Sequence, residues 1–194
     1  RNPGISVGYD AKLRVIDAPK FITQLVKQFE ARGGIDHIFL THRDDVADAE
    51  SYASHFKSQR IIHQDELSSQ PAAEVVLDGA GPWELAPEFL AILTPGHTKG
   101  HCVLLYDNRF LFTGDHLDWD RDEHRLSASE NYCWYSWPQQ ADSMARLAEY
   151  HFEWILPGHG QKVKLPPDAM KEQIMRLAVS MREAPFQGTT NNSP

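Results

Sequence analysis

The sequence predicts an α/β protein, because strand-like and helix-like hydrophobic patterns alternate along its first third. Residues Leu13–Ile16 form a short apolar run that is typical of a strand. Residues 22–29 then place apolar side chains at positions i, i+3, i+4 and i+7, the spacing of a helix with one buried stripe, and Gly33 and Gly34 end that helix. This alternation is typical of strands covered by helices.

The same alternation continues through the next segment of the chain. A second apolar run, residues 38–40, stops abruptly at the polar segment 41–45, and functional loops are often found at such strand ends. A helical stretch through Tyr52 and Phe56 precedes another strand at residues 60–63. The first third therefore predicts strand, helix, strand, helix, strand.

Short strands and two longer helices are predicted for the rest of the chain. From residue 75 to residue 112 the pattern changes to several short strands with turns between them. The predicted elements include a hairpin of residues 102–106 and 110–113, a helix after Pro138, a strand at residues 154–156 and a helix through residues 170–181.

The length of 194 residues fits one domain and leaves no room for a second large one. We expect a single domain at residues 1–186 and a flexible polar tail at residues 187–194. Because the chain begins with Arg1 rather than Met, we expect that the natural N-terminus can be missing, together with any targeting segment that preceded it.

Charge and cysteine content narrow the classes of partner and compartment. The net charge of −8 argues against broad affinity for nucleic acid or an anionic membrane, and no apolar run reaches the length of an ordinary transmembrane helix. Two cysteines cannot build a disulfide framework, so a reducing compartment is expected. We therefore predict a cytoplasmic location, or an organelle if a targeting segment preceded Arg1, and a small-molecule substrate. The oligomeric state stays open.

Three of the ten histidines and one aspartate follow directly after apolar, strand-like runs. They are His42, His97, Asp115 and His159. Imidazole nitrogens and carboxylate oxygens are the usual protein ligands of zinc and iron, and loops at one edge of a sheet can bring distant residues together around an ion. This pattern predicts a metal centre.

Three motifs around these residues resemble the metallo-β-lactamase-fold hydrolases. Residues 94–101 read T-P-G-H-T-K-G-H, residues 112–115 read F-T-G-D and residues 156–160 read L-P-G-H-G, in the family's order. The resemblance implies a four-layer αβ/βα sandwich with two mixed sheets flanked by helices. It also implies that His97 binds a first ion, Asp115 bridges two ions and His159 binds the second.

The family's first motif, H-x-H-x-D-H, is only partly present. His42 occupies its opening position, but Asp44 stands at the second histidine and Val46-Ala47 at the D-H pair. A shift of two residues would set Asp48 at the aspartate position without restoring the last histidine. We therefore predict Asp44 and Asp48 either as substitute metal ligands or as helix-capping carboxylates, two interpretations that the sequence leaves even.

The ligand set predicts a metal-dependent hydrolase that holds one or two zinc ions, with iron or manganese as alternatives. A bound metal would lower the pKa of a water that attacks an ester, thioester, lactone, amide or phosphodiester, and Asp44, Asp45 or Asp48 would transfer a proton. His42, His97 and Asp115 also form the two-histidine, one-carboxylate set of mononuclear iron, which is similar to the persulfide dioxygenases of the same superfamily. The third alternative is a metal-poor, non-catalytic relative.

Further residues near the motifs have two interpretations each. His101 and His116 adjoin the motifs and are expected behind the ligands rather than among them. Residues 119–137 carry five aromatic side chains, which could line a substrate pocket or pack a long loop onto the core. We favour packing. The five are Trp119, Tyr132, Trp134, Tyr135 and Trp137.

Overall fold

A computed structural model of the chain describes residues 13–183, and the predicted tail at 187–194 lies outside the described residues. Its first sheet has the order β1-β2-β3-β4, and every neighbouring pair in it is parallel. The strands are β1 (Leu13–Ile16), β2 (Ile35–Phe39), β3 (Gln59–His63) and β4 (Val75–Leu77). The predicted alternation of strands and helices in the first third is confirmed.

The second sheet has six strands in the order β12-β11-β8-β7-β6-β5. They are β5 (Trp83–Ala86), β6 (Phe89–Leu93), β7 (Cys102–Tyr106), β8 (Phe110–Gly114), β11 (Trp154–Pro157) and β12 (Val163–Lys164). Only β11 and β8 pair in parallel. Of the two sheets predicted to be mixed, this one is mixed, whereas the described strands of the first are wholly parallel. A small separate ribbon pairs β9 (Asp118–Asp120) with β10 (Arg125–Ser127).

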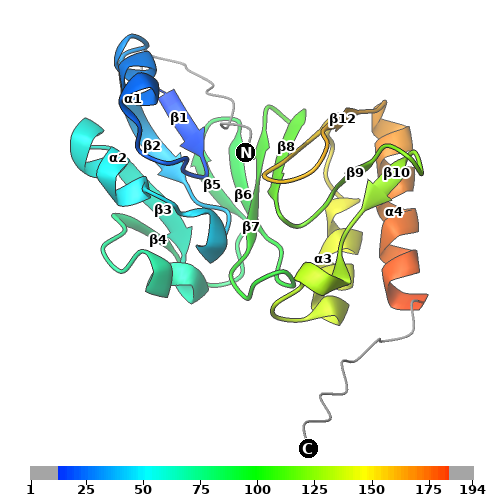
Figure 1. Ribbon diagram of the computed structural model, residues 1–194. Coiled ribbons are helices and arrows are strands. Elements are labelled where there is room, and N and C mark those ends of the chain that lie inside the picture. The colour runs from blue at the N-terminus through cyan, green and yellow to red at the C-terminus, as the bar shows by residue number, and fades with distance from the viewer. Residues whose placement is uncertain (1–12, 184–194) are drawn as a thin grey trace, which may run out of the picture.

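Helices cover the outer face of each sheet (Figure 1). α1 (Thr23–Glu30) and α2 (Ala49–Phe56) lie on the four-stranded sheet, and α3 (Trp137–Leu147) and α4 (Pro167–Glu183) pack together on the six-stranded sheet. The short 3₁₀ helices are η1 (Arg43–Asp45), η2 (Gln64–Ser69) and η3 (Glu130–Tyr132). The predicted four-layer sandwich is confirmed.

The strand β7 shows how one segment serves two hydrophobic cores. Its residues are all buried, and successive side chains point to opposite faces of the sheet. Val103 and Leu105 pack with α3 and α4, whereas Cys102 and Leu104 face the strands of the other sheet. A strand covered on both faces reads as a continuous apolar run, as the sequence of β7 does.

The strand ends that precede the metal motifs share one edge of the sandwich. Strands β6, β8 and β11 run in the same direction, so their carboxyl ends meet at one edge of the six-stranded sheet. The backbone N–H of Cys102 donates to the carbonyl of Thr41 at 2.8 Å, which ties the end of β2 in the other sheet to the same edge. Four loops that are distant in sequence therefore converge there.

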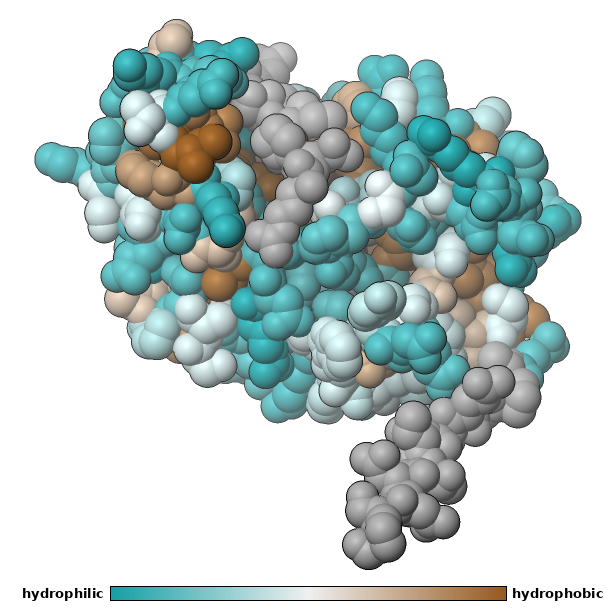
Figure 2. Space-filling model, in the orientation of Figure 1, coloured by the Kyte–Doolittle hydropathy of each residue, from teal (hydrophilic) through white to brown (hydrophobic). Residues whose placement is uncertain are grey.

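Figure 2 shows one face of the molecule, coloured by hydropathy. That face is mostly hydrophilic, with hydrophobic residues gathered at its upper left beside α1. Among the described residues, no helix combines enough length with enough apolar character to cross a bilayer.

Candidate metal centre

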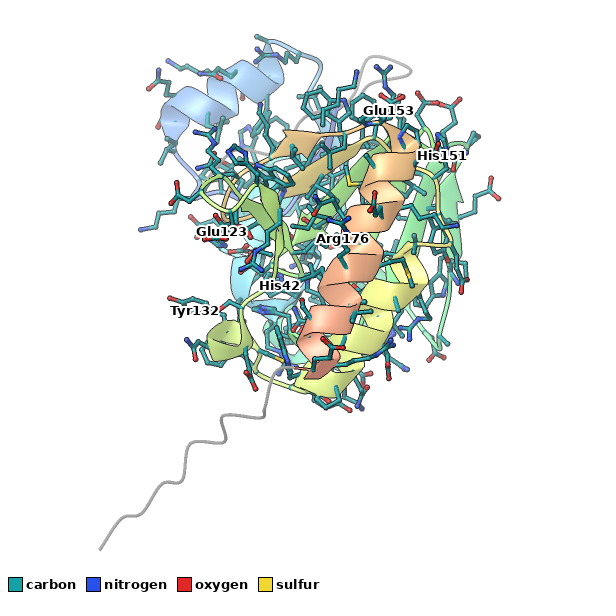
Figure 3. The ribbon with its side chains drawn as sticks, turned by 90° about the vertical axis from the view of Figure 1, so that its right-hand side faces the viewer. His42, Glu123, Tyr132, His151, Glu153 and Arg176 are labelled. Atoms are coloured by element: carbon teal, nitrogen blue, oxygen red, sulfur yellow. The ribbon has the colours of Figure 1, made fainter. Side chains whose placement is uncertain are left out.

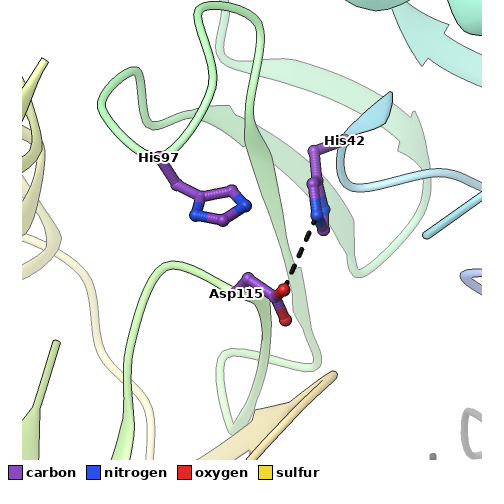
Figure 4. A group of neighbouring side chains, drawn as sticks. All are labelled: His42, His97 and Asp115. Carbon is purple, nitrogen blue, oxygen red and sulfur yellow. Dashed lines mark ion pairs between the residues drawn. The ribbon is translucent and has the colours of Figure 1, made fainter. Parts of the chain in front are cut away.

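His42, His97 and Asp115 form the first group of potential ligands. One ligand atom from each lies within 4.8 Å of the others. Nε2 of His42 is 3.7 Å from Oδ2 of Asp115, and Figure 4 shows the two imidazole rings converging on this carboxylate. Both histidines are buried, whereas Asp115 is partly exposed. The spacing leaves room for one ion between the three side chains.

Two buried nitrogens in this group lack any hydrogen-bond partner. They are Nε2 of His42 and Nε2 of His97. Leaving a buried polar atom unpaired costs about 1 to 3 kcal/mol, so native structures seldom do so without a functional reason. Both atoms face the Asp115 side of the cluster (Figure 4). A metal ion would satisfy both lone pairs, and the residues present fit such an ion.

A hydrogen-bonded chain holds the His42 ring in the orientation that a ligand needs. Nδ1 of His42 lies 2.9 Å from the Thr41 hydroxyl, and that hydroxyl lies 2.9 Å from the Asp17 carboxyl group. With Nδ1 donating to Thr41, Nε2 keeps its lone pair. Burial lowers the pKa of His42 to about 3, so the imidazole is neutral, and it raises the pKa of Asp17 to about 8.

Asp45, Asp115 and His159 form the second group, again within 4.8 Å of one another. Nδ1 of His159 lies 2.8 Å from Oδ1 of Asp115 and 3.6 Å from Oδ2 of Asp45. Asp45 is buried, whereas half of the His159 side chain is exposed. Asp115 belongs to both groups, which is the arrangement of a carboxylate that bridges two ions.

The altered first motif contributes Asp45, which the sequence analysis considered only for proton transfer. Residues 43–45 form the short 3₁₀ helix η1, which begins directly after the extended residue His42. His42 belongs to the first ligand group and Asp45 to the second. The two registers considered in the sequence analysis came from alignment with the motif H-x-H-x-D-H, and they selected Asp44 and Asp48 instead.

Asp44 and Asp48 lie outside both ligand groups. Oδ2 of Asp44 is 3.8 Å from Nε2 of His97, but half of this side chain is exposed at the rim. Asp48 points away, and its Oδ2 accepts the backbone N–H of Phe21 at 2.7 Å. Asp48 stands at the N-cap of α2 without making a side-chain capping bond. The structure therefore brings together His42, His97, Asp115 and His159, but does not bring Asp48 to them.

Comparison with known proteins places the fold in a family. The chain is 30% identical over 170 residues to the lactamase-like protein adaB of Aspergillus niger, an alignment that covers 84% of this chain and 50% of adaB. It resembles FIM-1 metallo-β-lactamase of Pseudomonas aeruginosa in its mono-zinc form, with a TM-score of 0.67, 17% identity and coverage of 90% and 82% of the two chains. The chain has the metallo-β-lactamase fold and is related in sequence to adaB.

Solved structures that resemble this chain contain different metals. The TTHA1623 protein in a di-iron-bound form matches with a TM-score of 0.61 and 19% identity, over 87% of this chain and 97% of that one. No protein-family model matches the chain. The chain spans about half the length of the curated relative adaB. These likenesses support the metallo-β-lactamase fold and leave the metal open between zinc and iron.

Glu66 joins the loops of two candidate ligands, His42 and His97, and no motif in the sequence marks it. It is fully buried in η2. Its Oε2 accepts Nε–H of Arg43 at 2.7 Å, and its Oε1 accepts the backbone N–H of Gly100 at 2.6 Å. Arg43 follows the ligand His42, and Gly100 belongs to the loop of His97. The carboxylate therefore fixes one ligand loop against the other.

Two further histidines lie behind the ligands. His101 and His116 are fully buried, and their rings stack with centroids 5.4 Å apart, while the His101 ring lies 5.2 Å from that of His42. Nδ1 of His101 bonds to the Thr94 hydroxyl at 2.9 Å. Burial lowers the pKa of both imidazoles, that of His116 to about 3. Neither belongs to a ligand group.

A cavity of about 700 Å³ opens over both ligand groups, between the loops that follow the strands and the segment around η3. The side chains of Tyr132 and Trp134 line it and are 65% and 64% exposed. Trp119 and Trp137 instead pack against the core, and Nε1 of Trp137 donates to the carbonyl of Met181 at 3.0 Å. The packing interpretation therefore holds for these two tryptophans, and the pocket interpretation for Tyr132 and Trp134.

Proposed function

We propose that this chain is a metal-dependent hydrolase with a two-ion site. The observation that carries the proposal is that Asp115 belongs to both ligand groups and presents one oxygen to each. His42 and His97 supply two imidazole nitrogens from one side, and Asp45 with His159 supplies a carboxylate and an imidazole from the other. Nitrogen and carboxylate oxygen ligands suit zinc first, and also iron or manganese.

The reaction proposed is the addition of water to an acyl or phosphoryl centre held in the cavity. A divalent metal at this site supplies Lewis acidity toward the substrate oxygen and lowers the pKa of water. Asp44 lines the cavity without belonging to a ligand group, so it is placed to accept the proton that the water loses. The proton then passes to the departing oxygen, sulfur or nitrogen as its bond to the centre breaks.

The substrate class is a small ester, thioester, lactone or phosphodiester. The cavity volume suits a small molecule, because ligand pockets commonly span about 300 to 1,000 Å³. The net charge of −8 argues against a polyanionic nucleic acid as substrate. Since the curated relatives are about twice as long as the aligned region, this activity is proposed for the portion of the protein that the chain represents.

A mononuclear iron oxygenase is the second candidate, and one observation favours it. His42, His97 and Asp115 alone make the two-histidine, one-carboxylate set that leaves open coordination positions on iron. This candidate gives Asp45 no metal-binding role. A non-catalytic, metal-free relative is less consistent with two buried imidazole nitrogens that have no other partner.

Hydrolysis and metal binding are tested together on one preparation. Protein loaded with zinc, and separately with iron, is assayed on a panel of esters, thioesters, lactones and phosphodiesters, while oxygen consumption is recorded with thiol and persulfide substrates. We expect hydrolysis that falls at least about 100-fold in Asp115→Ala, because a metal ligand has been removed. Oxygen uptake by the iron form without hydrolysis would overturn the hydrolase and favour the oxygenase.

A further inference from the structure

We propose that the cavity above Asp115 selects substrates whose non-reacting part is an aromatic group without negative charge. The inference rests on the proposed hydrolase function and specifies its substrate class. It depends on three properties of the cavity wall: two aromatic side chains at the mouth, their attachment to a ligand loop, and the sign of the charges around them.

Tyr132 and Trp134 form an aromatic corner at the mouth. Their ring centroids lie 6.3 Å apart and the ring planes meet at 81°, so one ring presents its edge to the face of the other. Both residues remain about two-thirds exposed, and Figure 3 shows Tyr132 at the edge of the ribbon, with His42 further inward. Large exposed aromatic side chains beside a cavity are typical of binding sites for flat ligands.

The aromatic corner is fixed to the backbone of a metal ligand. The backbone N–H of Trp134 donates to the carbonyl of His97 at 2.9 Å, and the N–H of Ser136 donates to the carbonyl of Gly96 at 2.9 Å. The Cys133 thiol also donates to Gly96, at 3.1 Å. Because these bonds tie the corner to the loop that carries His97, a ring bound against Trp134 keeps a set distance from the reacting centre.

Gly96 makes this attachment possible. Its φ of +153° is a conformation that residues with a side chain rarely adopt, and a Cβ there would come within 2.4 Å of Cα of Gln140 in α3. Helix α3 begins directly after the corner, where the Ser136 side chain accepts the N–H of Gln139. The corner is therefore held between a ligand loop and the start of a helix.

Apart from the two ligand groups, the charged side chains that line the cavity are negative. Asp44 and Asp118 line it, whereas no lysine or arginine of the described chain does. Arg43 and Lys99 line a neighbouring hollow on the other side of Trp134. Arg43 is paired with Glu66, and Lys99 with Asp65 at 2.9 Å. A carboxylate on the outer part of a substrate would therefore meet two aspartates and no free cation.

Three phenyl benzoates that differ only in the para substituent test this selection. The substituents are methyl, trimethylammonium and carboxylate on the benzoyl ring, so the leaving group stays the same while the charge changes, and each rate is compared with that of the same ester hydrolysing without protein. In each turnover, water adds to the ester carbon, the bond to the phenolic oxygen breaks, and a benzoic acid and phenol are released. We expect kcat/KM for the neutral and cationic esters to exceed that of the anionic ester at least about 10-fold, because like charges repel across a partly desolvated cavity.

Variants of Trp134 and Tyr135 test which aromatic side chain forms the wall of the cavity. Trp134→Ala is expected to lower kcat/KM for the neutral ester about 10-fold, mostly through KM, whereas Trp134→Phe retains most of it. Tyr135→Ala is the matched control, because Tyr135 is exposed in the same segment but does not line this cavity. Equal losses in Trp134→Ala and Tyr135→Ala would overturn the assignment of the wall.

Binding of the corresponding benzamides separates failure of this inference from failure of the hydrolase proposal. The three para-substituted benzamides are titrated into the protein with and without zinc, and tryptophan fluorescence and NMR shifts report binding. Selective binding of the neutral and cationic amides without ester hydrolysis would overturn the hydrolase proposal and support the inferred selectivity of the cavity. Ester hydrolysis with an equal or greater preference for the anionic ester would overturn the inference and leave the hydrolase standing.

Discussion

The two carboxylate oxygens of Asp115 face two different histidines. Oδ1 lies 2.8 Å from Nδ1 of His159, and Oδ2 lies 3.7 Å from Nε2 of His42. His42 follows a strand of the four-stranded sheet, whereas His159 follows a strand of the six-stranded sheet. Asp115 therefore joins candidate ligands from both halves of the sandwich, and the proposed metal centre depends on the sheets keeping their relative position.

Replacement of Asp115 by asparagine is expected to remove metal binding without unfolding the protein. Asparagine keeps the size of the side chain but loses the charge and one ligand oxygen. Since loss of residues that only support a ligand costs about 10- to 100-fold in metal affinity, we expect a loss of at least about 100-fold here. Calorimetric titration with zinc measures it, with circular dichroism as the folding control. Unchanged affinity in a folded variant would contradict the bridging role.

A pair of matched variants distinguishes the metal-binding roles of Asp45 and Asp48. Asp45→Asn removes a carboxylate of the second ligand group, so the bound metal at saturation is expected to fall from two ions to one. Asp48→Asn changes a carboxylate that only accepts the N–H of Phe21, so two ions should remain. Metal content per chain at saturating zinc distinguishes them. Two ions in Asp45→Asn and one ion in Asp48→Asn would instead support Asp48 as a metal ligand.

Glu66→Gln tests whether the buried carboxylate positions the metal loops. We expect the free energy of unfolding to fall by about 1 to 3 kcal/mol, because hydrogen bonds of a buried charged group to Arg43 and Gly100 are weakened. We also expect metal affinity to fall about 10- to 100-fold. Glu30→Gln, at an exposed pair with His55, is the control and should change neither. A stability loss with unchanged metal affinity would limit Glu66 to a structural role.

Glu74 gives a prediction for pH. Hydrogen bonding from the Arg60 guanidinium lowers the pKa of Glu74 from its usual 4.5 to about 2. The folded state therefore binds fewer protons than the unfolded state, so this stabilisation is present above about pH 4.5 and disappears as the pH falls toward about 2. Because Glu74 is partly exposed, the gain is about 1 kcal/mol or less.

Urea unfolding of the wild type and of Glu74→Gln measures this pH effect. The difference in unfolding free energy between the two proteins should be largest near neutral pH and shrink steadily below about pH 4.5. Arg60 also bonds to Gln70 and Ala72 near the end of η2, so the pair supports the segment that carries Glu66. A difference that grows as the pH falls would contradict the sign of the shift.

The order of elements and three of the metal motifs could be predicted from the sequence, because each depends on local patterns. The apolar runs of β2, β7 and β8 and the helical spacing of α4 needed no tertiary information. His97, Asp115 and His159 each follow a strand within a recognisable motif. Their convergence follows from the parallel course of β6, β8 and β11.

The remaining features depend on geometry that single motifs do not encode. Asp45 lies in the 3₁₀ helix η1 and belongs to the second ligand group, although neither register of the first motif places a ligand at this position. Glu66 acts through hydrogen bonds to Arg43 and Gly100, which lie 23 and 34 positions from it along the chain. No spacing in the sequence reveals such contacts. The exposure of Trp134 and the packing of Trp137 against the core were equally unpredictable, since both residues lie in one aromatic segment.

Metal content measures the central claim most directly. Protein purified without added metal or chelator, and then titrated with zinc and with ferrous iron, is analysed for every transition metal per chain, alongside Asp115→Asn. The account predicts at least one ion per chain as purified, two at saturation, and loss of tight binding in the variant. A folded wild-type protein that holds no ion and takes up none on titration would contradict it.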